Sequence, residues 1–477
     1  MVTVPRVVIA APGSGHGKTS VATGLLGALR DSGLTVSPHK VGPDYIDPGY
    51  HALAAGRPGR NLDPWLVGED QIAAMFVHGA TTPVPADIAV IEGVMGLFDG
   101  KADPAGLATG GDFASTAHVA RLLGAPVVLV VDASGMAASA AALLHGFATF
   151  DPQVRLGGVI FNQAGSDRHG QLLRDAADAA GVPVLGVIRR DSQLALPSRH
   201  LGLVPARELG GEATAAVSAL TAAVAAQLDL AAVVALARSA GPLPAFPSPD
   251  PQQPVLPGPA PRIAVAAGPA FTFGYAEHPE LLAAAGAEVV AFDPLRDERL
   301  PERTAGLVIG GGFPEEHAVS LSANTRLKDE VTALARAGAP VLAECAGLLY
   351  LARSLDGHPM CGVLDVDATM TGRLTLGYRD AVAVTGSPLG PAGTRAHGHE
   401  FHRTDITTES ADASSQASPA KPADRAWQWR TTGGVVSEGL VRGGVHASYL
   451  HTHWNGIPGV AARMTEAAAR YAQECRA

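Results

Sequence analysis

The sequence predicts an α/β fold with two domains, each built on a mainly parallel sheet with flanking helices. Short apolar, β-branched segments alternate with Ala-rich helical segments along most of the 477 residues. This alternation is typical of parallel strands joined by helices. One proline-rich segment, residues 241–261, interrupts it and excludes both a helix and a central strand. We therefore expect a domain over residues 1–240, a linker over 241–261 and a second domain over 262–465.

Apolar runs mark the expected strands of both domains. In the first domain they include Arg6–Ala11, Ile88–Ile91, Val127–Val131, Gly157–Phe161 and Val184–Val187, with a further strand candidate before His39. In the second domain they are IAVAAG from residue 263, EVVAFD from 288, LVIGGG from 307 and PVLAEC from 340. Residues 410–425 are small and polar, which predicts a flexible surface insertion without a chemical role.

Composition and charge exclude several classes of function. The net charge is −10 and no basic stripe is visible, so we expect no nucleic-acid binding. No unbroken apolar stretch reaches the about 18 residues of a membrane span. The N-terminal apolar run passes directly into a glycine-rich loop, which predicts a strand and not a signal peptide. Three widely spaced cysteines argue against a disulfide framework and predict a cytoplasmic protein.

A phosphate-binding loop is predicted directly after the first strand. Residues 13–20 read GSGHGKTS and open a helix, so backbone N–H groups can surround phosphate oxygens while Lys18 reaches the terminal phosphates. Pro12 stands where the usual spacing has a glycine, which predicts a compact variant of the loop. Asn162 ends a later strand, where its amide either reads a purine edge or caps the strand. The expected nucleotide-binding residues are Gly13, Gly15, Gly17, Lys18, Thr19, Ser20 and Asn162.

Carboxylates are expected at the same edge of the sheet. Asp44 and Asp47 lie on a loop stiffened by two prolines. Pro-Asp pairs are also common in turns, so the alternative is a purely structural role. Glu92 and Asp99 follow the third strand, at the carboxyl edge where phosphates bind. We expect Thr19, Glu92, Asp44 and Asp47 around Mg²⁺, which prefers oxygen ligands.

The second domain carries a candidate nucleophile, Cys345, between an apolar strand and a helical segment. Backbone N–H groups and the helix dipole at such a turn favour the thiolate form of the side chain. The alternative interpretation is that Cys345 is only a small, buried apolar residue. Gly310–Gly312 follow another strand, and Gly311, Gly312 and Ala346 are the expected oxyanion donors.

Three histidines near the end of this domain are candidates for the base that the thiol requires. We expect His451 to be the base in preference to His453, and His446 to be structural. A metal site on the His-x-His pair lacks further ligands nearby.

These motifs resemble known families. Cys345, the glycine turn and the late histidine are similar to the class I glutamine amidotransferase domain, and the first domain resembles the dethiobiotin synthetase-like ATPases. Most of that class carry a glutamate two residues after the histidine, where this chain has His453, so the third catalytic member is not assigned. The strings that carry a closer resemblance are KVGPDYIDPGYH (40–51), EGVMGLFDG (92–100), GGFPE (311–315), GYR (377–379), YLH (449–451) and GHEFH (398–402). Together they resemble the cobyrinic acid (hydrogenobyrinic acid) a,c-diamide synthase family.

The resemblance implies an ATP- and L-glutamine-dependent amidoligase of cobalamin biosynthesis. It would amidate the a and c acetates of hydrogenobyrinate or cobyrinate through acyl phosphates, with Mg²⁺ and with ammonia released at Cys345. Asp99, Tyr378, Arg379 and His399 are then expected at the acceptor. The Ala/Gly-rich, lysine-poor composition suggests a high-GC bacterium, which favours the cobalt-free acceptor of the aerobic route. A homodimer is the default expectation. The alternatives are cobyric acid synthase, another tetrapyrrole amidase, or a partitioning-type switch ATPase with a non-catalytic partner module.

Overall fold

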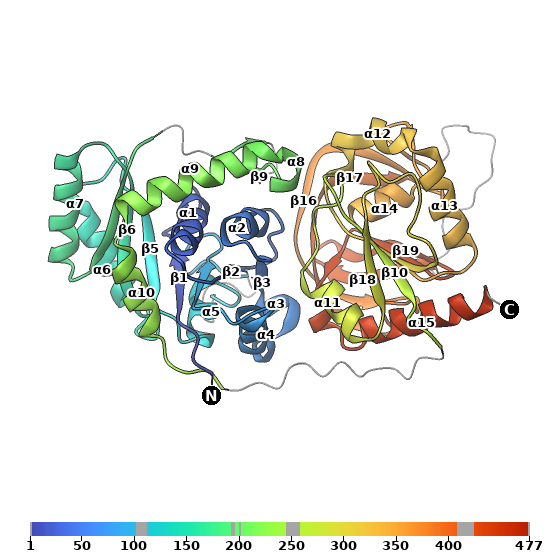
Figure 1. Ribbon diagram of the computed structural model, residues 1–477, viewed down its shortest axis with the longest axis horizontal. Helices are drawn as coiled ribbons and strands as arrows, with labels where there is room; N and C mark the ends of the chain where they lie inside the picture. The colour runs from blue at the N-terminus through green and yellow to red at the C-terminus, as the bar shows by residue number, and fades with distance from the viewer. Residues whose placement is uncertain are drawn as a thin grey trace. The chain divides into compact units, whose positions relative to one another are not determined.

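The computed structural model describes residues 2–101, 112–191, 196–199, 202–244, 258–407 and 424–475. The chain divides into two compact units, Met1–Ser248 and Pro249–Ala477. Each unit contains a sheet with packed helices, which confirms the predicted α/β fold class (Figure 1). Residues 245–257 of the expected linker, and all but the last two residues of the expected 410–425 insertion, lie outside the described residues.

The first unit is built on a sheet whose described strands follow the order β3-β2-β4-β1-β5-β6-β7, with every pair parallel. The strands are β1 (Arg6–Ala10), β2 (Val36–Val41), β3 (Arg60–Leu62), β4 (Ile88–Glu92), β5 (Val127–Asp132), β6 (Leu156–Ala164) and β7 (Val184–Arg189). All five strands expected from apolar runs are present. Every residue of β1 and β4 is buried, as is usual for parallel strands covered on both faces.

Helices pack on this sheet and fix the position of the phosphate loop. They are α1 (Lys18–Asp31), α2 (Asp47–Ala55), α3 (Pro64–Val67), α4 (Glu69–Thr81), α5 (Thr116–Leu122), α6 (Ser139–Thr149), α7 (Asp167–Ala179), α8 (Ala206–Leu209), α9 (Gly211–Gln227) and α10 (Leu230–Arg238). Figure 1 shows α9 running along α1 and α2. The contact is close, because a Cβ at Gly27 would lie 2.0 Å from Oγ1 of Thr221. This packing holds α1, whose N-terminus carries the loop.

The second unit combines a parallel sheet with an antiparallel ribbon. Its strands are β10 (Arg262–Ala266), β11 (Glu288–Phe292), β12 (Thr304–Ile309), β13 (Val341–Glu344), β14 (Ser354–Leu355), β15 (His358–Pro359), β16 (Asp367–Ala383), β17 (Arg395–Thr407), β18 (Arg425–Thr431), β19 (Gly434–Arg442), β20 (Val445–Ser448) and β21 (His451–Thr452). The four expected strands are β10 to β13, which pair in parallel with each other and with β20. The antiparallel strands β16 to β19 were not predicted.

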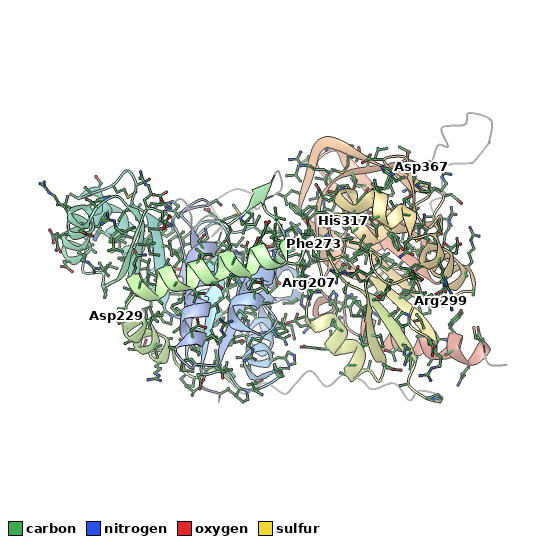
Figure 2. All side chains as sticks on the ribbon, turned by 45° about the horizontal axis from the view of Figure 1, so that its top comes forward. Arg207, Asp229, Phe273, Arg299, His317 and Asp367 are labelled. Carbon is green, nitrogen blue, oxygen red and sulfur yellow. The ribbon has the colours of Figure 1, made fainter. Side chains whose placement is uncertain are left out.

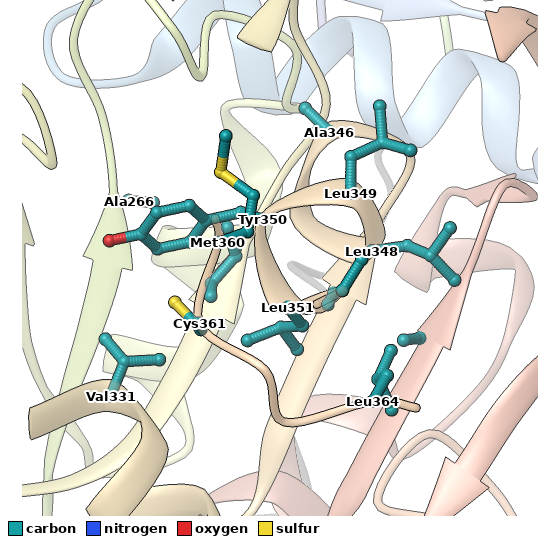
Figure 3. Close-up of a cluster of buried hydrophobic side chains, with 14 of the residues drawn as sticks. Ala266, Val331, Ala346, Leu348, Leu349, Tyr350, Leu351, Met360, Cys361 and Leu364 are labelled. Carbon is teal, nitrogen blue, oxygen red and sulfur yellow. The ribbon is translucent and has the colours of Figure 1, made fainter. Parts of the chain in front are cut away.

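Helices of the second unit pack against this sheet. They are α11 (Glu277–Ala284), α12 (Ala318–Ala323), α13 (Thr325–Arg336), α14 (Ala346–Leu351) and α15 (Val460–Glu474), with short 3-10 helices η3 (Pro314–His317) and η5 (Trp454–Gly456). Every residue of α14 is buried, and Figure 3 shows its side chains packed with Met360, Cys361 and Leu364. Burying each large apolar side chain contributes about 1.5–3 kcal/mol, so the packing of α14 stabilises the position of the turn before it. None of the described helices is long and apolar enough to cross a membrane.

Candidate active sites

The phosphate loop lies between β1 and α1. Gly15 and Gly17 have φ values of 85° and 90°, which favour glycine, and a Cβ at Gly17 would lie 2.3 Å from Nδ2 of Asn162. Nζ of Lys18 donates to the carbonyl oxygens of Gly13, at 3.0 Å, and Met95, at 2.5 Å. Burial and the neighbouring Lys40 lower the pKa of Lys18 to about 8. The loop therefore positions the lysine through carbonyl contacts that a phosphate oxygen can replace.

Lys40, Asp47 and Glu92 are buried beside the loop and form a polar cluster with the partly buried Thr19, here called the buried cluster. Oγ1 of Thr19 donates to Oε1 of Glu92 at 2.7 Å and to Oδ2 of Asp47 at 3.2 Å. Nζ of Lys40 donates to Oδ2 of Asp47 at 2.7 Å and to Oε1 of Glu92 at 2.9 Å. Nε2 of His51 lies 2.6 Å from Oε2 of Glu92. The sequence expectation that Thr19, Asp47 and Glu92 meet at the sheet edge thus agrees with their positions.

The neighbours of the two carboxylates shift their pKa values in opposite directions, although Lys40 lowers both. Burial raises the pKa of Glu92, but Lys40 and His51 outweigh it and hold this pKa well below its usual range. Burial and Asp44 raise the pKa of Asp47 to about 7, against the opposing effect of Lys40. Burial lowers the pKa of Lys40, but Asp47 and Glu92 hold it well above its usual value. The cluster therefore contains an ionised Glu92 paired with a charged lysine.

The oxygens of this cluster fit a hard divalent cation. Oδ2 of Asp47 and Oε1 of Glu92 both lie within hydrogen-bond distance of Oγ1 of Thr19. The two carboxylate oxygens also accept from the ammonium of Lys40, so the site stabilises positive charge. In the part of the chain that the structure describes, no group of three or more His, Cys, Asp or Glu is arranged to hold a metal. Mg²⁺ in nucleotide sites typically takes one or two carboxylates plus phosphate oxygens. A magnesium site here would therefore be completed by the nucleotide.

The other two predicted carboxylates stabilise turns. Oδ1 of Asp44 accepts hydrogen bonds from the backbone N–H groups of Ile46, at 2.7 Å, and Asp47, at 3.0 Å. Oδ2 of Asp99 accepts from the backbone N–H of Gly96 at 2.8 Å. These contacts shape the two loops that border the cluster. A direct role of Asp44 at the metal, or of Asp99 at the acceptor, stays a prediction.

Asn162 lies beneath the phosphate loop. Its Nδ2 donates to the carbonyl of His16 at 3.1 Å, and its Oδ1 accepts from the backbone N–H of Gln163 at 2.9 Å. Asn162 also lines a cavity of about 380 Å³ together with Gly15, Gly17, Ser20, Asp132, Arg189 and Leu220. This volume lies within the range of small-molecule sites. The residue thus supports the loop and borders a cavity beside it.

Cys345 stands on the turn between β13 and α14, as the sequence predicts. Its φ of 50° and ψ of −101° lie outside the regions that non-glycine residues usually adopt. The backbone N–H of Cys345 donates to the carbonyl of Ser448 at 2.7 Å, and its buried Sγ lies 3.9 Å from the carbonyl of Phe401. A strained turn of this kind presents a nucleophile at the end of a sheet.

Two of the three predicted oxyanion donors, Ala346 and Gly312, direct backbone N–H groups at this thiol. The third prediction is wrong for the N–H of Gly311, because it donates to the carbonyl of Phe273 at 3.1 Å. Burial and the nearby Glu315 raise the pKa of Cys345 well above its usual value, while hydrogen bonds from the backbone N–H groups of Ala346 and Gly312 oppose this increase. The sequence predicts that the turn favours thiolate. The N–H groups do act in that direction, but burial outweighs them. The thiol therefore needs a base before it can attack.

Backbone contacts fix the glycine turn. Phe273, labelled in Figure 2, exchanges two backbone hydrogen bonds with Gly311, of 3.0 and 3.1 Å. The N–H of Gly347 donates to the carbonyl of Gly310 at 3.0 Å, which ties α14 to the same turn. A Cβ at Gly311 would lie 2.6 Å from Cε1 of His451. The turn that supplies the Gly312 N–H to the thiol therefore also borders the imidazole.

His451 and His453 have different neighbours. Nδ1 of His451 lies 3.8 Å from Oε2 of Glu344. Nε2 of His453 lies 3.6 Å from Oε2 of Glu277, and its Nδ1 accepts from the backbone N–H of Asn455 at 3.2 Å. These contacts tie His453 to α11 and η5. The histidine at the position of the usual class I glutamate is thus engaged elsewhere.

His446 is distinct from these two. Its Nδ1 lies 3.1 Å from Oγ of Ser387, its ring packs edge-on to Trp427, and burial lowers its pKa to about 4. These contacts agree with the structural role expected from the sequence.

Comparison with known proteins places both units in one family. A CobQ/CobB/MinD/ParA nucleotide binding domain matches residues 7–204, and a CobB/CobQ-like glutamine amidotransferase domain matches residues 262–458. Hydrogenobyrinate a,c-diamide synthase of Streptomyces coelicolor is 58% identical over 97% of each chain, and that of Thermobifida fusca is 52% identical over 97% of each. Cobyrinate a,c-diamide synthase of Syntrophotalea carbinolica is 44% identical over 96% of this chain and 97% of its own. The chain belongs to the a,c-diamide synthase family.

Membership of this family confirms the predicted resemblance and an ATP-dependent, glutamine-using amidating ligase. The nucleotide-binding match covers the phosphate loop and the buried cluster, and the amidotransferase match covers Cys345 and His451. A switch ATPase with a non-catalytic partner module does not account for the second match.

Three residues expected at the acceptor, Tyr378, Arg379 and His399, lie on the ribbon of β16 and β17. His399 is the register partner of His451, and its ring lies 5.6 Å from that of Tyr378. Burial, His451 and Arg379 lower the pKa of His399 to about 3. Nε of Arg379 donates to Oε2 of Glu400 at 2.6 Å. His399 therefore lies beside His451, and Arg379 is held in an ion pair. Contact with the acceptor stays a prediction for all three residues.

Sequence reasoning assigned no role to several residues that the structure places at the two centres. Lys40 and His51 contact Glu92, and Glu344 contacts His451. All three lie inside or next to the sequence motifs of other site residues. That proximity could have suggested a role for them, but their contacts are with residues distant in sequence, which the sequence alone does not reveal.

Proposed function

We propose that this protein amidates the a and c acetate carboxylates of hydrogenobyrinate, with ATP and glutamine as co-substrates. The observation that carries the proposal is the presence of two complementary centres in one chain. One is a phosphate loop beside Thr19, Asp47 and Glu92, and the other is a buried thiol that receives backbone N–H groups. Relatives at 52 to 58% identity are named for the cobalt-free acceptor and those at 41 to 44% for cobyrinate, which favours hydrogenobyrinate.

In the second unit, Cys345 attacks the amide carbon of glutamine while the thiol proton passes to His451. The N–H groups of Ala346 and Gly312 stabilise the oxyanion that forms. The carbon–nitrogen bond then breaks as His451 returns the proton to nitrogen, which releases ammonia and leaves a thioester. His451 next deprotonates water, which hydrolyses the thioester to glutamate and restores the thiol.

In the first unit, the acceptor carboxylate must be activated because its charge repels nucleophiles and oxide is a poor leaving group. The carboxylate attacks the γ-phosphorus of ATP and gives an acyl phosphate and ADP. Ammonia then displaces phosphate, loses a proton to solvent and forms the amide. The N–H groups of the glycine loop and Lys18 would hold the β- and γ-phosphates. The cavity beside Asn162 would take the nucleoside.

The oxygens of Thr19, Asp47 and Glu92 would hold Mg²⁺, with Asp44 shaping their loop. When bound, this cation neutralises phosphate charge that builds up during transfer. Asp99 fixes the neighbouring loop through Gly96 and is proposed on the acceptor side.

The test is an isotope experiment on the full chain. Hydrogenobyrinate and cobyrinate are incubated separately with ATP, Mg²⁺ and glutamine labelled with ¹⁵N in the amide, and the products are analysed by mass spectrometry. Two labelled amides at the a and c positions of hydrogenobyrinate support the proposal. Label only in cobyrinate would change the acceptor, and amidation at other positions would indicate a cobyric acid synthase. Sedimentation of the same preparation tests the expected homodimer.

A further inference from the structure

We propose that Glu344 is the positioning residue that orients His451 for glutamine hydrolysis. It would take the place of the glutamate that most class I domains carry two residues after the histidine. This inference rests on the proposed glutaminase function of the second unit. Glu344 is the last residue of β13 and directly precedes the nucleophile.

The geometry of Glu344 supports this role. Oε2 of Glu344 lies 3.8 Å from Nδ1 of His451, and the two side chains are only 16% and 1% exposed. The other carboxylate oxygen, Oε1, accepts hydrogen bonds from the hydroxyl of Thr452, at 2.7 Å, and from its backbone N–H, at 3.2 Å. Thr452 follows His451 in the chain. The carboxylate is therefore fixed to the strand that carries the imidazole, with one oxygen facing that ring.

A carboxylate beside Nδ1 has two effects on a histidine base. It selects the tautomer with the proton on Nδ1, in which Nε2 carries the lone pair that accepts the thiol proton. It also stabilises the imidazolium that forms when that proton arrives, and the low polarity of a buried site strengthens this interaction. The present separation is that of an ion pair and exceeds a hydrogen bond, and such contacts commonly tighten when substrate binds.

His453 is the alternative by sequence position, but its contacts are with other elements. Its Nε2 faces Glu277 on α11, its Nδ1 accepts from Asn455, and its ring packs 4.5 Å from that of Tyr275. Glu344 instead lies within ion-pair distance of His451 and precedes Cys345, so one short segment would supply both the nucleophile and the group that orients its base.

The decisive substitution is Glu344→Gln, which keeps the shape and removes the charge. We expect glutaminase kcat to fall about 100-fold while the KM for glutamine stays within about twofold, because orientation of the base affects proton transfer and not substrate binding. Alkylation of Cys345 by a diazoketone analogue of glutamine should slow in proportion to kcat. Amidation with ammonium salt should keep its rate.

Two further substitutions provide matched controls. Thr452→Val removes the hydroxyl that holds Oε1 of Glu344, and we expect about a tenfold loss of kcat that Thr452→Ser restores. Asp367→Asn breaks another carboxylate pair of the same unit, with Arg353 at 2.6 Å (Asp367 is labelled in Figure 2), and should leave glutaminase kcat within about twofold.

Several outcomes would overturn the role of Glu344. They are a kcat of Glu344→Gln within about twofold of the parent, or a raised KM with unchanged kcat, which would indicate glutamine binding. If circular dichroism shows that Glu344→Gln does not fold, the Thr452 variants decide. Equal kcat values for Thr452→Val and Thr452→Ser would then contradict the proposed role of Glu344. Glutaminase activity that survives Cys345→Ala would instead reject the proposed function, whatever the Glu344 variant does.

Discussion

At the scale of single residues, two buried cysteines of the second unit show that backbone context decides what a thiol does. Burial raises the pKa of both Cys345 and Cys361, the latter to about 12. Cys361 packs against Tyr350 in the core drawn in Figure 3 and donates its backbone N–H to that residue at 3.0 Å. Cys345 has a positive φ and receives backbone N–H groups from two sides. Only Cys345 has the surroundings of a nucleophile.

Replacement of these cysteines should separate the two activities of the enzyme. Cys345→Ala should abolish amidation with glutamine and leave amidation with high ammonium salt largely intact, because only the first reaction needs the thiol. Cys361→Ala should keep both activities and lose ~1 kcal/mol of unfolding free energy. Product formation with each nitrogen source measures the effect. Loss of both activities in a folded Cys345→Ala protein would contradict this division of labour.

Glu92 provides the corresponding test in the first unit. Glu92→Gln removes the charge that pairs with Lys40 and accepts from Thr19, so we expect amidation to fall about 100-fold with glutamine and with ammonium salt alike. Glutaminase activity measured without acceptor should change little. An unaffected rate of amidation would remove Glu92 from the magnesium site.

At the scale of elements, the strands that the sequence predicted are short apolar runs bounded by turns or helical segments. β1, β4 and β13 are short runs that are apolar apart from one charged residue at an end, and so the sequence predicts them directly. Most residues of β16 are at least partly exposed, and β17 alternates buried with more exposed positions. Their Gly, Arg and His residues suggested separate motifs and not strands. The positions of Cys345 and the phosphate loop followed from such visible strands. The neighbours of His451 did not, because Glu344 lies 107 residues before it in the chain.

A carboxylate supports the segment between β20 and β21, and its protonation should be visible in stability. Oε2 of Glu438 accepts from the hydroxyl of Ser448 at 2.6 Å, and Oε1 accepts from the N–H of Tyr449 at 2.7 Å. Burial, with Glu400, raises the pKa of Glu438 from 4.5 to about 7, although the hydrogen bonds from Ser448 and Tyr449 oppose this. Between these two pH values the folded state retains a proton that the unfolded chain has lost.

The free energy of unfolding should therefore fall as pH rises from about 4.5 to 7, by up to ~3 kcal/mol from this group. Urea denaturation of the parent and of Glu438→Gln across this range measures the difference, because the amide cannot titrate. The advantage of the variant over the parent should grow with pH. A difference that is constant with pH would show that Glu438 has no raised pKa.

At the scale of the whole molecule, the chain divides its chemistry between two compact units, each with its own sheet and its own family match. The phosphate loop and the buried cluster belong to the first unit, and the thiol and its oxyanion donors to the second. Under the proposed function, glutamine-dependent amidation requires ammonia made at Cys345 to reach an acyl phosphate bound by the other unit. Ammonia released into water at neutral pH is mostly protonated and no longer nucleophilic, so direct transfer is the efficient route.

Direct transfer predicts the origin of the product nitrogen. With ¹⁵N-amide glutamine and an equal concentration of unlabelled ammonium salt near pH 7, we expect the amides of the product to carry mostly ¹⁵N, because nascent ammonia would react before it mixes with solvent. In Cys345→Ala the product should carry only unlabelled nitrogen, which calibrates the contribution of free ammonium. Mass spectrometry of early time points distinguishes the two routes. Product label that follows the bulk ratio of labelled to total ammonia would show that ammonia leaves the enzyme before it is used.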